Sequence, residues 1–190
     1  MEGLNFSKID KTWTLFLDRD GVINYEKRNG YISGWKDYKL YEDALDALAI
    51  FTKVFGRIVI VSNQKGVGRG ITKLKDLNEI TERLLALVNE SGGRIDKVYY
   101  AFDIDAAAPN RKPNPGMAWQ AKADFPEIDF GKSIMVGNRL SDMEFAQKAG
   151  MYAVFLATTH PETEFPHPWI ERRFEGLGVM ASEVKMAGEK

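Results

Sequence analysis

Short, continuous apolar runs alternate with segments of helical spacing along this chain, and few folds accommodate that alternation. A run such as Arg57–Val61 is apolar at every position after its arginine, which is typical of a strand buried on both faces. A segment such as Ala44–Val54 spaces its apolar residues as a helix does. Strands that alternate with helices predict a parallel sheet with helices on both sides. The predicted strands are 13–17, 57–61, 97–102, 133–136 and 152–156, and the predicted helices are 44–54, 72–89, 115–124 and 140–148.

The length of 190 residues suits one domain with a substantial core. We therefore predict a single α/β domain over 1–190, a Rossmann-like three-layer sandwich around a central parallel sheet. Its core is expected over 12–160. Prolines interrupt residues 158–170 and the tail from Glu183 is polar, so 161–190 is predicted to be an extended C-terminal segment.

The composition excludes several classes of function. Hydrophobic residues make up 44% and charged residues 28%, with a net charge of −1, so bulk electrostatics favours neither a nucleic-acid nor a membrane partner. The chain has no cysteine, which excludes disulfides, thiolate catalysis and cysteine-ligated zinc. Residues 1–6 do not show a basic region followed by an apolar stretch, so no signal peptide is expected, and no apolar run reaches the roughly 18 residues of a membrane span. A cytoplasmic protein is expected, and a monomer is allowed, although the sequence leaves the oligomeric state open.

Two carboxylates follow the first predicted strand. Asp18 and Asp20 follow four apolar residues and precede Gly21. Two acids this close raise each other's pKa unless a proton or a cation neutralises them. Mg²⁺ prefers oxygen ligands and would make the pair tolerable, leaving one acid as nucleophile and the other as proton donor. The simpler alternative is a turn at the end of a strand, where Asp and Gly are common.

Polar residues also follow later strands. Ser62 and Asn63 come at the end of the second strand and Asn138 after the fourth, with Asp142 four residues further on. The carboxyl ends of parallel strands meet at one edge of the sheet, where ligands bind. Each residue also has a structural explanation: a serine can close a loop, and an aspartate favours the first turn of a helix.

Two basic residues precede a predicted helix start. Arg111 and Lys112 lie before the stiff segment Pro113–Pro115, and helix N-termini favour anions. The alternative is a solvated basic pair before a proline turn. A glycine-rich segment, Gly66–Gly70, lacks the third glycine of a dinucleotide fingerprint and the Gly-Lys-Ser/Thr of a Walker loop, so we interpret it as a flexible loop near the site.

Taken in order, these segments resemble the haloacid dehalogenase superfamily of phosphatases. Within it, the chain is most similar to the subgroup of heptose-bisphosphate phosphatases and histidinol-phosphatase domains, which have a Rossmann-like core and no large cap domain. The segments that carry the resemblance are Leu17-Asp18-Arg19-Asp20-Gly21-Val22-Ile23-Asn24, Ser62-Asn63-Gln64-Lys65-Gly66-Val67-Gly68-Arg69-Gly70, Arg111-Lys112-Pro113-Asn114-Pro115-Gly116-Met117 and Gly137-Asn138 with Asp142.

The resemblance implies a role for each of these residues. Asp18 would attack phosphorus to form an aspartyl-phosphate, and Asp20 would serve as general acid and then general base. Ser62, Asn63, Arg111 and Lys112 are the implied phosphate- and substrate-binding residues. Mg²⁺ is the implied cofactor, with ligands from Asp18, the backbone carbonyl of Asp20, Asn138 and Asp142.

The chain departs from the family pattern in two places. The residue after Gly137 is usually an aspartate, whereas Asn138 is an uncharged amide, so weaker metal affinity is expected. Many relatives also carry a zinc loop of Cys and His just before the Arg-Lys-Pro segment. Here that stretch, Phe102–Asn110, has no Cys or His, and zinc is not expected.

The sequence therefore predicts a Mg²⁺-dependent phosphomonoesterase acting on a small phosphorylated metabolite. A sugar phosphate similar to heptose bisphosphate is favoured, and histidinol phosphate is the alternative substrate. A catalytically weakened protein that only binds a phosphorylated ligand is the alternative of another class. A polynucleotide 3′-phosphatase shares related motifs, but the near-neutral charge argues against it.

Overall fold

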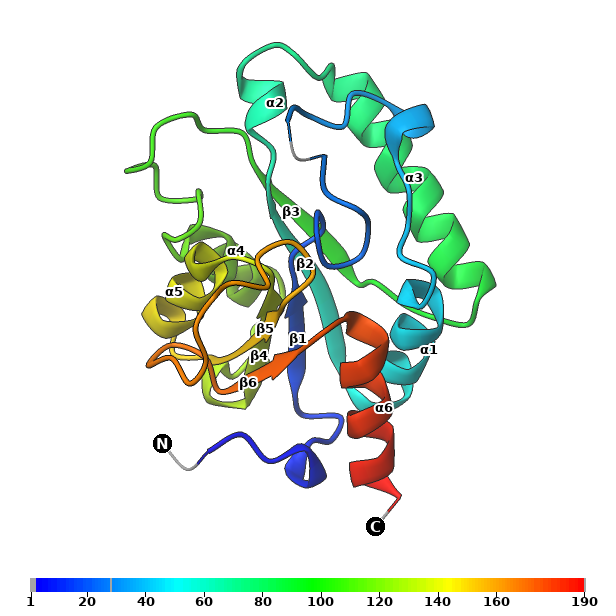
Figure 1. Ribbon diagram of the computed structural model, residues 1–190, viewed down its shortest axis with the longest axis vertical. Coiled ribbons are helices and arrows are strands. Elements are labelled where there is room, and N and C mark those ends of the chain that lie inside the picture. The colour runs from blue at the N-terminus through cyan, green and yellow to red at the C-terminus, as the bar shows by residue number, and fades with distance from the viewer. Residues whose placement is uncertain (1–2, 28, 190) are drawn as a thin grey trace.

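The computed structural model describes residues 3–27 and 29–189, which form one parallel six-stranded sheet with helices on both faces (Figure 1). The strand order is β3-β2-β1-β4-β5-β6. The strands are β1 (Thr14–Leu17), β2 (Arg57–Asn63), β3 (Lys97–Ala101), β4 (Ser133–Gly137), β5 (Tyr152–Leu156) and β6 (Arg172–Phe174). The helices are η1 (Phe6–Lys8), η2 (Trp35–Asp37), α1 (Ala44–Val54), α2 (Lys65–Gly68), α3 (Leu74–Glu90), α4 (Gly116–Asp124), η3 (Phe130–Lys132), α5 (Leu140–Ala149) and α6 (Leu177–Gly188).

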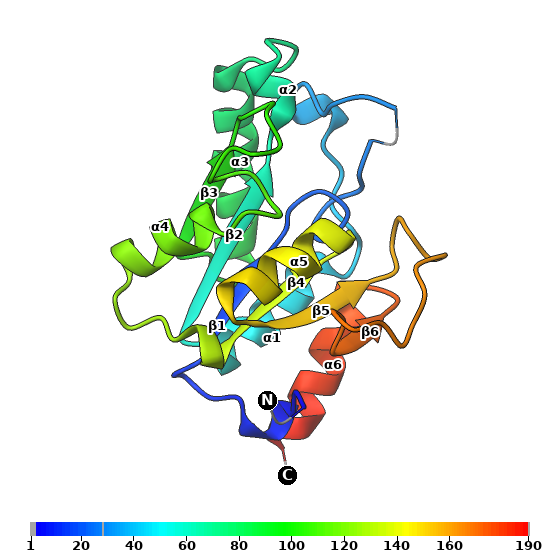
Figure 2. The same cartoon turned by 90° about the vertical axis from the view of Figure 1, so that its left-hand side faces the viewer.

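Alternate residues of the central strands divide the core into two halves. Leu15 and Leu17 of β1 face the half that α1, α3 and α6 cover, whereas Phe16 faces the half under α4 and α5. Figure 2 shows α4 and α5 together on one side of the sheet. This arrangement confirms the predicted three-layer α/β fold, its five strands and its four helices to within about two residues at most ends.

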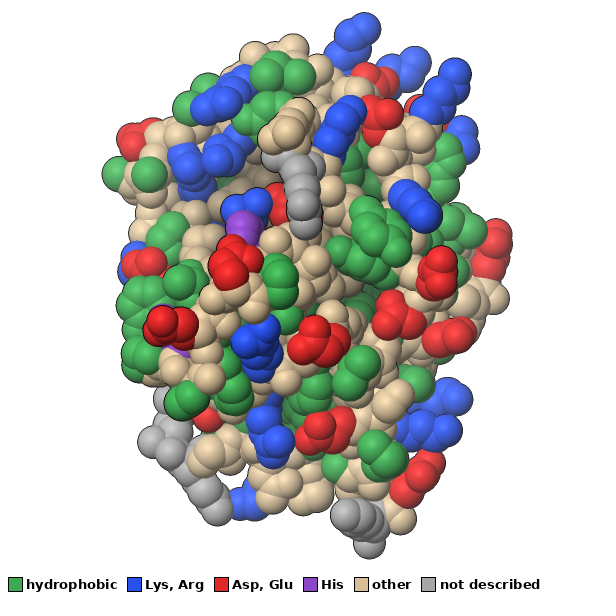
Figure 3. Space-filling view, in the orientation of Figure 1, with side chains coloured by type: hydrophobic (Ala, Val, Ile, Leu, Met, Phe, Trp, Pro, Cys, Tyr) green, Lys and Arg blue, Asp and Glu red, His purple; other side chains and the backbone are tan. Residues whose placement is uncertain are grey.

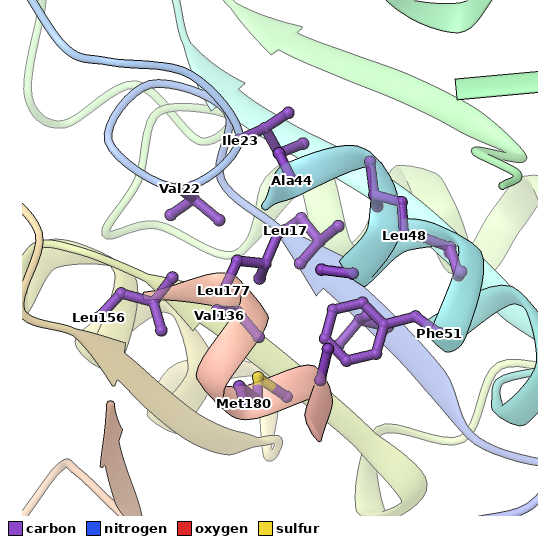
Figure 4. Packing of buried hydrophobic residues seen from close by; sticks show 14 of the residues in the cluster. Leu17, Val22, Ile23, Ala44, Leu48, Phe51, Val136, Leu156, Leu177 and Met180 are labelled. Carbon is purple, nitrogen blue, oxygen red and sulfur yellow. The ribbon is translucent and has the colours of Figure 1, made fainter. Parts of the chain in front are cut away.

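The prediction for the C-terminal segment was wrong. Residues 161–190 were expected to be extended, but they contain β6, which pairs parallel to β5, and the helix α6. Leu177 and Met180 are buried against the core cluster that includes Leu17 and Phe51 (Figure 4). The core of the domain therefore extends to the end of α6, because burial of this apolar helix face stabilises the segment.

The sheet has its topological switch point between β1 and β4. The chain runs outward from β1 through β2 to β3, and then returns to place β4 on the other side of β1. Loops at the carboxyl ends of these two strands diverge to opposite faces, which opens a crevice there. None of the helices in the described ranges combines the length and the apolarity that crossing a membrane requires.

Candidate active site

A cleft of about 600 Å³ lies at the carboxyl ends of β1, β2 and β4. Asp18 follows β1, Ser62 lies near the end of β2, and helix α5 after β4 supplies Asp142. Lys112 comes from the connection between β3 and α4. The residues predicted from the sequence that line the cleft are Asp18, Asp20, Ser62, Asn63, Arg111, Lys112 and Asp142. The remaining one, Asn138, is fully buried and is not among the residues that line the cleft. The structure thus brings distant segments together as expected.

Lys112 lies between two carboxylates. Its Nζ is 3.1 Å from Oδ1 of Asp18 and 2.7 Å from Oδ1 of Asp142, and all three residues are buried. Burial alone would lower the pKa of Lys112, but the two carboxylates outweigh it and raise the pKa. Burial raises the pKa of Asp18 to about 7, assisted by Asp142 and Asp20 and opposed by the Lys112 ammonium. One ammonium for two acids leaves this cluster with excess negative charge, which favours a second cation.

Asp20 is held in an ionised state by three donors. Its carboxylate accepts hydrogen bonds from Nη2 of Arg19 (3.0 Å to each oxygen), from Nδ2 of Asn24 (2.8 Å) and from Nε2 of Gln64 (2.8 Å). Burial raises the pKa of Asp20, but the Arg19 guanidinium and these hydrogen bonds outweigh burial and lower it below its usual value. Arg19 is itself buried, with the ring of Tyr38 centred 5.6 Å from its guanidinium carbon.

Asn138 is oriented by its neighbours. Its Nδ2 donates to Oγ1 of Thr159 at 2.6 Å and to Oε2 of Glu26 at 3.3 Å, while its Oδ1 is buried without a hydrogen-bond partner. Gly21 adopts a φ of 82°, and a Cβ at this position would lie 2.1 Å from Nδ2 of Asn138. Only glycine therefore lets the turn after β1 approach this amide.

Oxygen atoms of Asp18 and Asn138 suit a hard cation. Among the described residues, no three His, Asp or Glu side chains form a metal cluster, and the Asp20 carboxylate is already committed to Arg19, Asn24 and Gln64. The carboxylate of Asp18 and the unpartnered, buried Oδ1 of Asn138 are both oxygen donors of the kind that Mg²⁺ prefers. This orphaned oxygen is the observation that makes the residues fit a magnesium ion.

Comparison with known proteins identifies the family. The family model described as "Polynucleotide kinase 3 phosphatase" matches residues 14–155. The chain belongs to this family. It is a phosphatase of the haloacid dehalogenase superfamily, as its resemblance indicated.

Curated relatives and solved structures agree with this assignment. The chain is 34% identical over 160 residues to a D-glycero-D-manno-heptose-1,7-bisphosphate 7-phosphatase of Chlorobaculum tepidum, covering 78% of this chain and 80% of that one. It is 32% identical over 173 residues to a D-glycero-beta-D-manno-heptose-1,7-bisphosphate 7-phosphatase of Pseudomonas putida, covering 90% and 98%. The structure of D,D-heptose 1,7-bisphosphate phosphatase from B. bronchiseptica, complexed with magnesium and phosphate, has a TM-score of 0.82 at 25% identity and covers 92% of this chain and 98% of that one.

In this phosphatase the side chain of Asn63 forms hydrogen bonds with the backbone of Lys112. Its Nδ2 donates to the carbonyl oxygen of Lys112 and its Oδ1 accepts from the Lys112 backbone N–H, both at 3.0 Å. The side chain thus ties the end of β2 to the segment that presents Lys112. Direct binding of substrate by Asn63 stays a prediction.

The mouth of the cleft is basic. Lys65, Arg69, Arg111 and Arg139 line it, and Figure 3 shows Lys and Arg side chains gathered around a hollow on this face. Burial lowers the pKa of Lys65, and the charges of the three arginines lower it further, which indicates that these cations share one region. We call these four residues the basic rim. The guanidinium of Arg111 donates to the carbonyl of Ile104 and so also anchors the segment Phe102–Asn110.

Sequence reasoning missed Arg19, Gln64 and Glu26. Arg19 lies between the two predicted acids and Gln64 directly follows Ser62-Asn63, so adjacency to the motifs was the available signal. Glu26 carried no such signal, because its contact with Asn138 joins residues 112 positions apart.

Proposed function

We propose that this chain is a Mg²⁺-dependent phosphomonoesterase that hydrolyses a small sugar phosphate through an aspartyl-phosphate, with a heptose bisphosphate as the favoured substrate. The observation that carries the proposal is the placement of Lys112 between Asp18 and Asp142, in a cleft at the switch point of the sheet that Ser62 also lines. The names of the relatives support the sugar substrate.

In the first half-reaction, an oxygen of the Asp18 carboxylate attacks phosphorus while the bond from phosphorus to the leaving alcohol breaks. Lys112 and the Ser62 hydroxyl stabilise the phosphoryl oxygens during this transfer. Asp20 gives its proton to the departing alcohol oxygen. It must first gain that proton from solvent, and the negative charge of an arriving phosphate group raises the pKa of Asp20 in the required direction.

In the second half-reaction, water attacks phosphorus and the bond from phosphorus to Asp18 breaks. Asp20 now accepts a proton from this water, and the ionised state favoured by Arg19 suits that step. Asp18 and Asn138 would hold Mg²⁺, which when bound supplies positive charge that offsets the charge on the phosphoryl group.

The basic rim favours a substrate with a second anionic group. Lys65, Arg69, Arg111 and Arg139 line the cleft in addition to the Lys112 that the reacting phosphoryl group would contact. Arg139 pairs with Glu26, whereas the other three cations of the rim have no carboxylate partner among the described residues. A sugar bisphosphate supplies such a group, whereas histidinol phosphate carries a cationic amine instead. The open cleft admits either, so the rim is the feature that favours the bisphosphate.

The test is phosphate release from heptose 1,7-bisphosphate, a hexose monophosphate and histidinol phosphate, each with Mg²⁺ and with EDTA. We expect the highest kcat/KM for the bisphosphate and no turnover in EDTA. Asp18→Asn should lower kcat by about 10³-fold or more, whereas Asp46→Asn, the same change at an exposed position on α1, should leave it unchanged. A wild-type chain that binds inorganic phosphate but hydrolyses none of the three would instead be the weakened binding protein.

A further inference from the structure

Gln64 joins two parts of the site that the mechanism uses separately. Its side-chain nitrogen lies 2.8 Å from Oδ2 of Asp20 and 3.0 Å from Oγ of Ser62. The residue is buried, and its backbone N–H donates to the carbonyl of Ala101 at the end of β3, which fixes where the side chain begins.

The contact with Asp20 determines which end of the Gln64 amide faces inward. Both oxygens of the Asp20 carboxylate already accept hydrogen bonds from Nη2 of Arg19, so an amide oxygen 2.8 Å from Oδ2 would place two acceptors against each other. The nitrogen therefore faces Asp20. The same nitrogen contacts Ser62, so Oγ of Ser62 is the acceptor in that bond.

This arrangement fixes the direction of the Ser62 hydroxyl hydrogen. A hydroxyl has one hydrogen, and an oxygen that accepts from Gln64 must direct its own hydrogen elsewhere. Ser62 lines the cleft, and within the described residues its Oγ has no protein acceptor. The hydrogen is thus available to an oxygen of a group bound in the cleft.

We infer that Gln64 is a positioning residue that keeps the Ser62 hydroxyl oriented as a hydrogen-bond donor toward the bound phosphoryl group. The inference rests on the proposed function for the identity of that group. Without Gln64, the hydroxyl is free to rotate away from the bound group, so part of the contact with phosphate is lost. We expect the affinity for phosphate to fall by about tenfold, the scale of one hydrogen bond to a charged group.

A double-mutant cycle on phosphate binding tests this coupling. The variants are Gln64→Met, which keeps the side-chain length without polar atoms, Ser62→Ala, and the two combined, with Gln120→Met on the exposed face of α4 as the matched control. The dissociation constant of inorganic phosphate is measured by calorimetry in the presence of Mg²⁺, and thermal unfolding of each variant confirms that it is folded. Gln64→Ala replaces Gln64→Met if the latter does not fold.

If Gln64 acts through Ser62, its loss weakens phosphate binding about tenfold in the wild-type background and by less than about twofold in Ser62→Ala. Equal losses in both backgrounds, or no loss in either, overturn the inference, because a residue that only supports the loop affects both alike. Binding needs no turnover, so the cycle is independent of the hydrolysis assay. A coupled cycle in a protein that hydrolyses nothing would refute the proposed function alone.

Discussion

Replacing Lys112 with methionine tests the charge cluster on which the site depends. The substitution keeps most of the side-chain volume but removes the ammonium from between Asp18 and Asp142, whose side chains are only 11% and 1% exposed. Removing one partner from a buried ion pair leaves uncompensated charge, at a cost of about 3–5 kcal/mol in the free energy of unfolding. In a chain of this size each kcal/mol shifts Tm by about 2–4 °C, so we expect Tm to fall by roughly 6–20 °C.

The direction of the pH dependence follows from Asp18. Burial already holds the pKa of Asp18 at about 7 with Lys112 present, and losing the ammonium raises it further. Protonation then removes one of the two uncompensated charges. The loss of unfolding free energy caused by Lys112→Met should therefore be largest near pH 8 and should become smaller as the pH falls to about 6.

Thermal unfolding in EDTA, at both pH values, provides the measurement. Lys75→Met, at an exposed position on α3, is the matched control and should leave Tm unchanged. Mg²⁺ should restore part of the stability of Lys112→Met, because the metal places positive charge near Asp18 once more. A Tm within about 2 °C of wild type near pH 8, or a penalty that grows as the pH falls, would refute this account of the cluster.

Three further outcomes follow from the same geometry. In the metal-free wild type, the pKa of Asp18 is raised from 3.8 to about 7 in the folded state. Its contribution to the free energy of unfolding is therefore complete below pH 3.8 and is lost as the pH rises through 7. Denaturant unfolding in EDTA should show this loss of stability, and Mg²⁺ should make the loss smaller. Asn138→Asp places a carboxylate near Glu26, now 3.3 Å from Nδ2, so calorimetry should find tighter Mg²⁺ binding in Asn138→Asp combined with Glu26→Gln than in Asn138→Asp alone. Gly21→Ala brings a Cβ to 2.1 Å from Nδ2 of Asn138, so it should lower both Tm and Mg²⁺ affinity, and unchanged values would contradict the close approach.

The sequence predicted the sheet because its signals are local. A buried parallel strand such as β2 is apolar throughout, and a helix such as α3 repeats its apolar residues with the period of its own backbone. The C-terminal end of α5 could also be predicted, since Gly150 adopts the left-handed conformation that ends a helix. These features depend on neighbours within a few residues, so no tertiary information was needed.

The C-terminal helix α6 escaped prediction for a partly non-local reason. Its apolar residues do have helical spacing, but Gly176 gives it no side-chain cap. The cap comes from the start of α1, where the Asp43 carboxylate accepts from the backbone N–H of Gly178 at 2.9 Å. A cap supplied from 135 residues away leaves no local signature, and the preceding prolines favoured an extended segment.

The partners of the site residues were similarly hidden. Residue types at strand ends predicted that Asp18 and Ser62 would meet, because parallel strands must share an edge. Lys112 was expected there from its place before a helix start and from the resemblance to the family. Neither signal predicted that Asp20 would be tied to Arg19 and Gln64, since side-chain pairing depends on how the loops pack.

The balance of charge at this sheet edge explains why an amide at position 138 is compatible with phosphatase chemistry. The buried acids Asp18 and Asp142 share one ammonium, and Glu26 already approaches the far side of Asn138. A carboxylate at 138 would add like charge between these groups, whereas the amide donates to Glu26 and still leaves Oδ1 for a cation. We therefore expect each of Mg²⁺ and phosphate to raise the affinity for the other. The positive charge of Mg²⁺ offsets the charge of the buried acids, and the negative charge of phosphate offsets the charge of Mg²⁺.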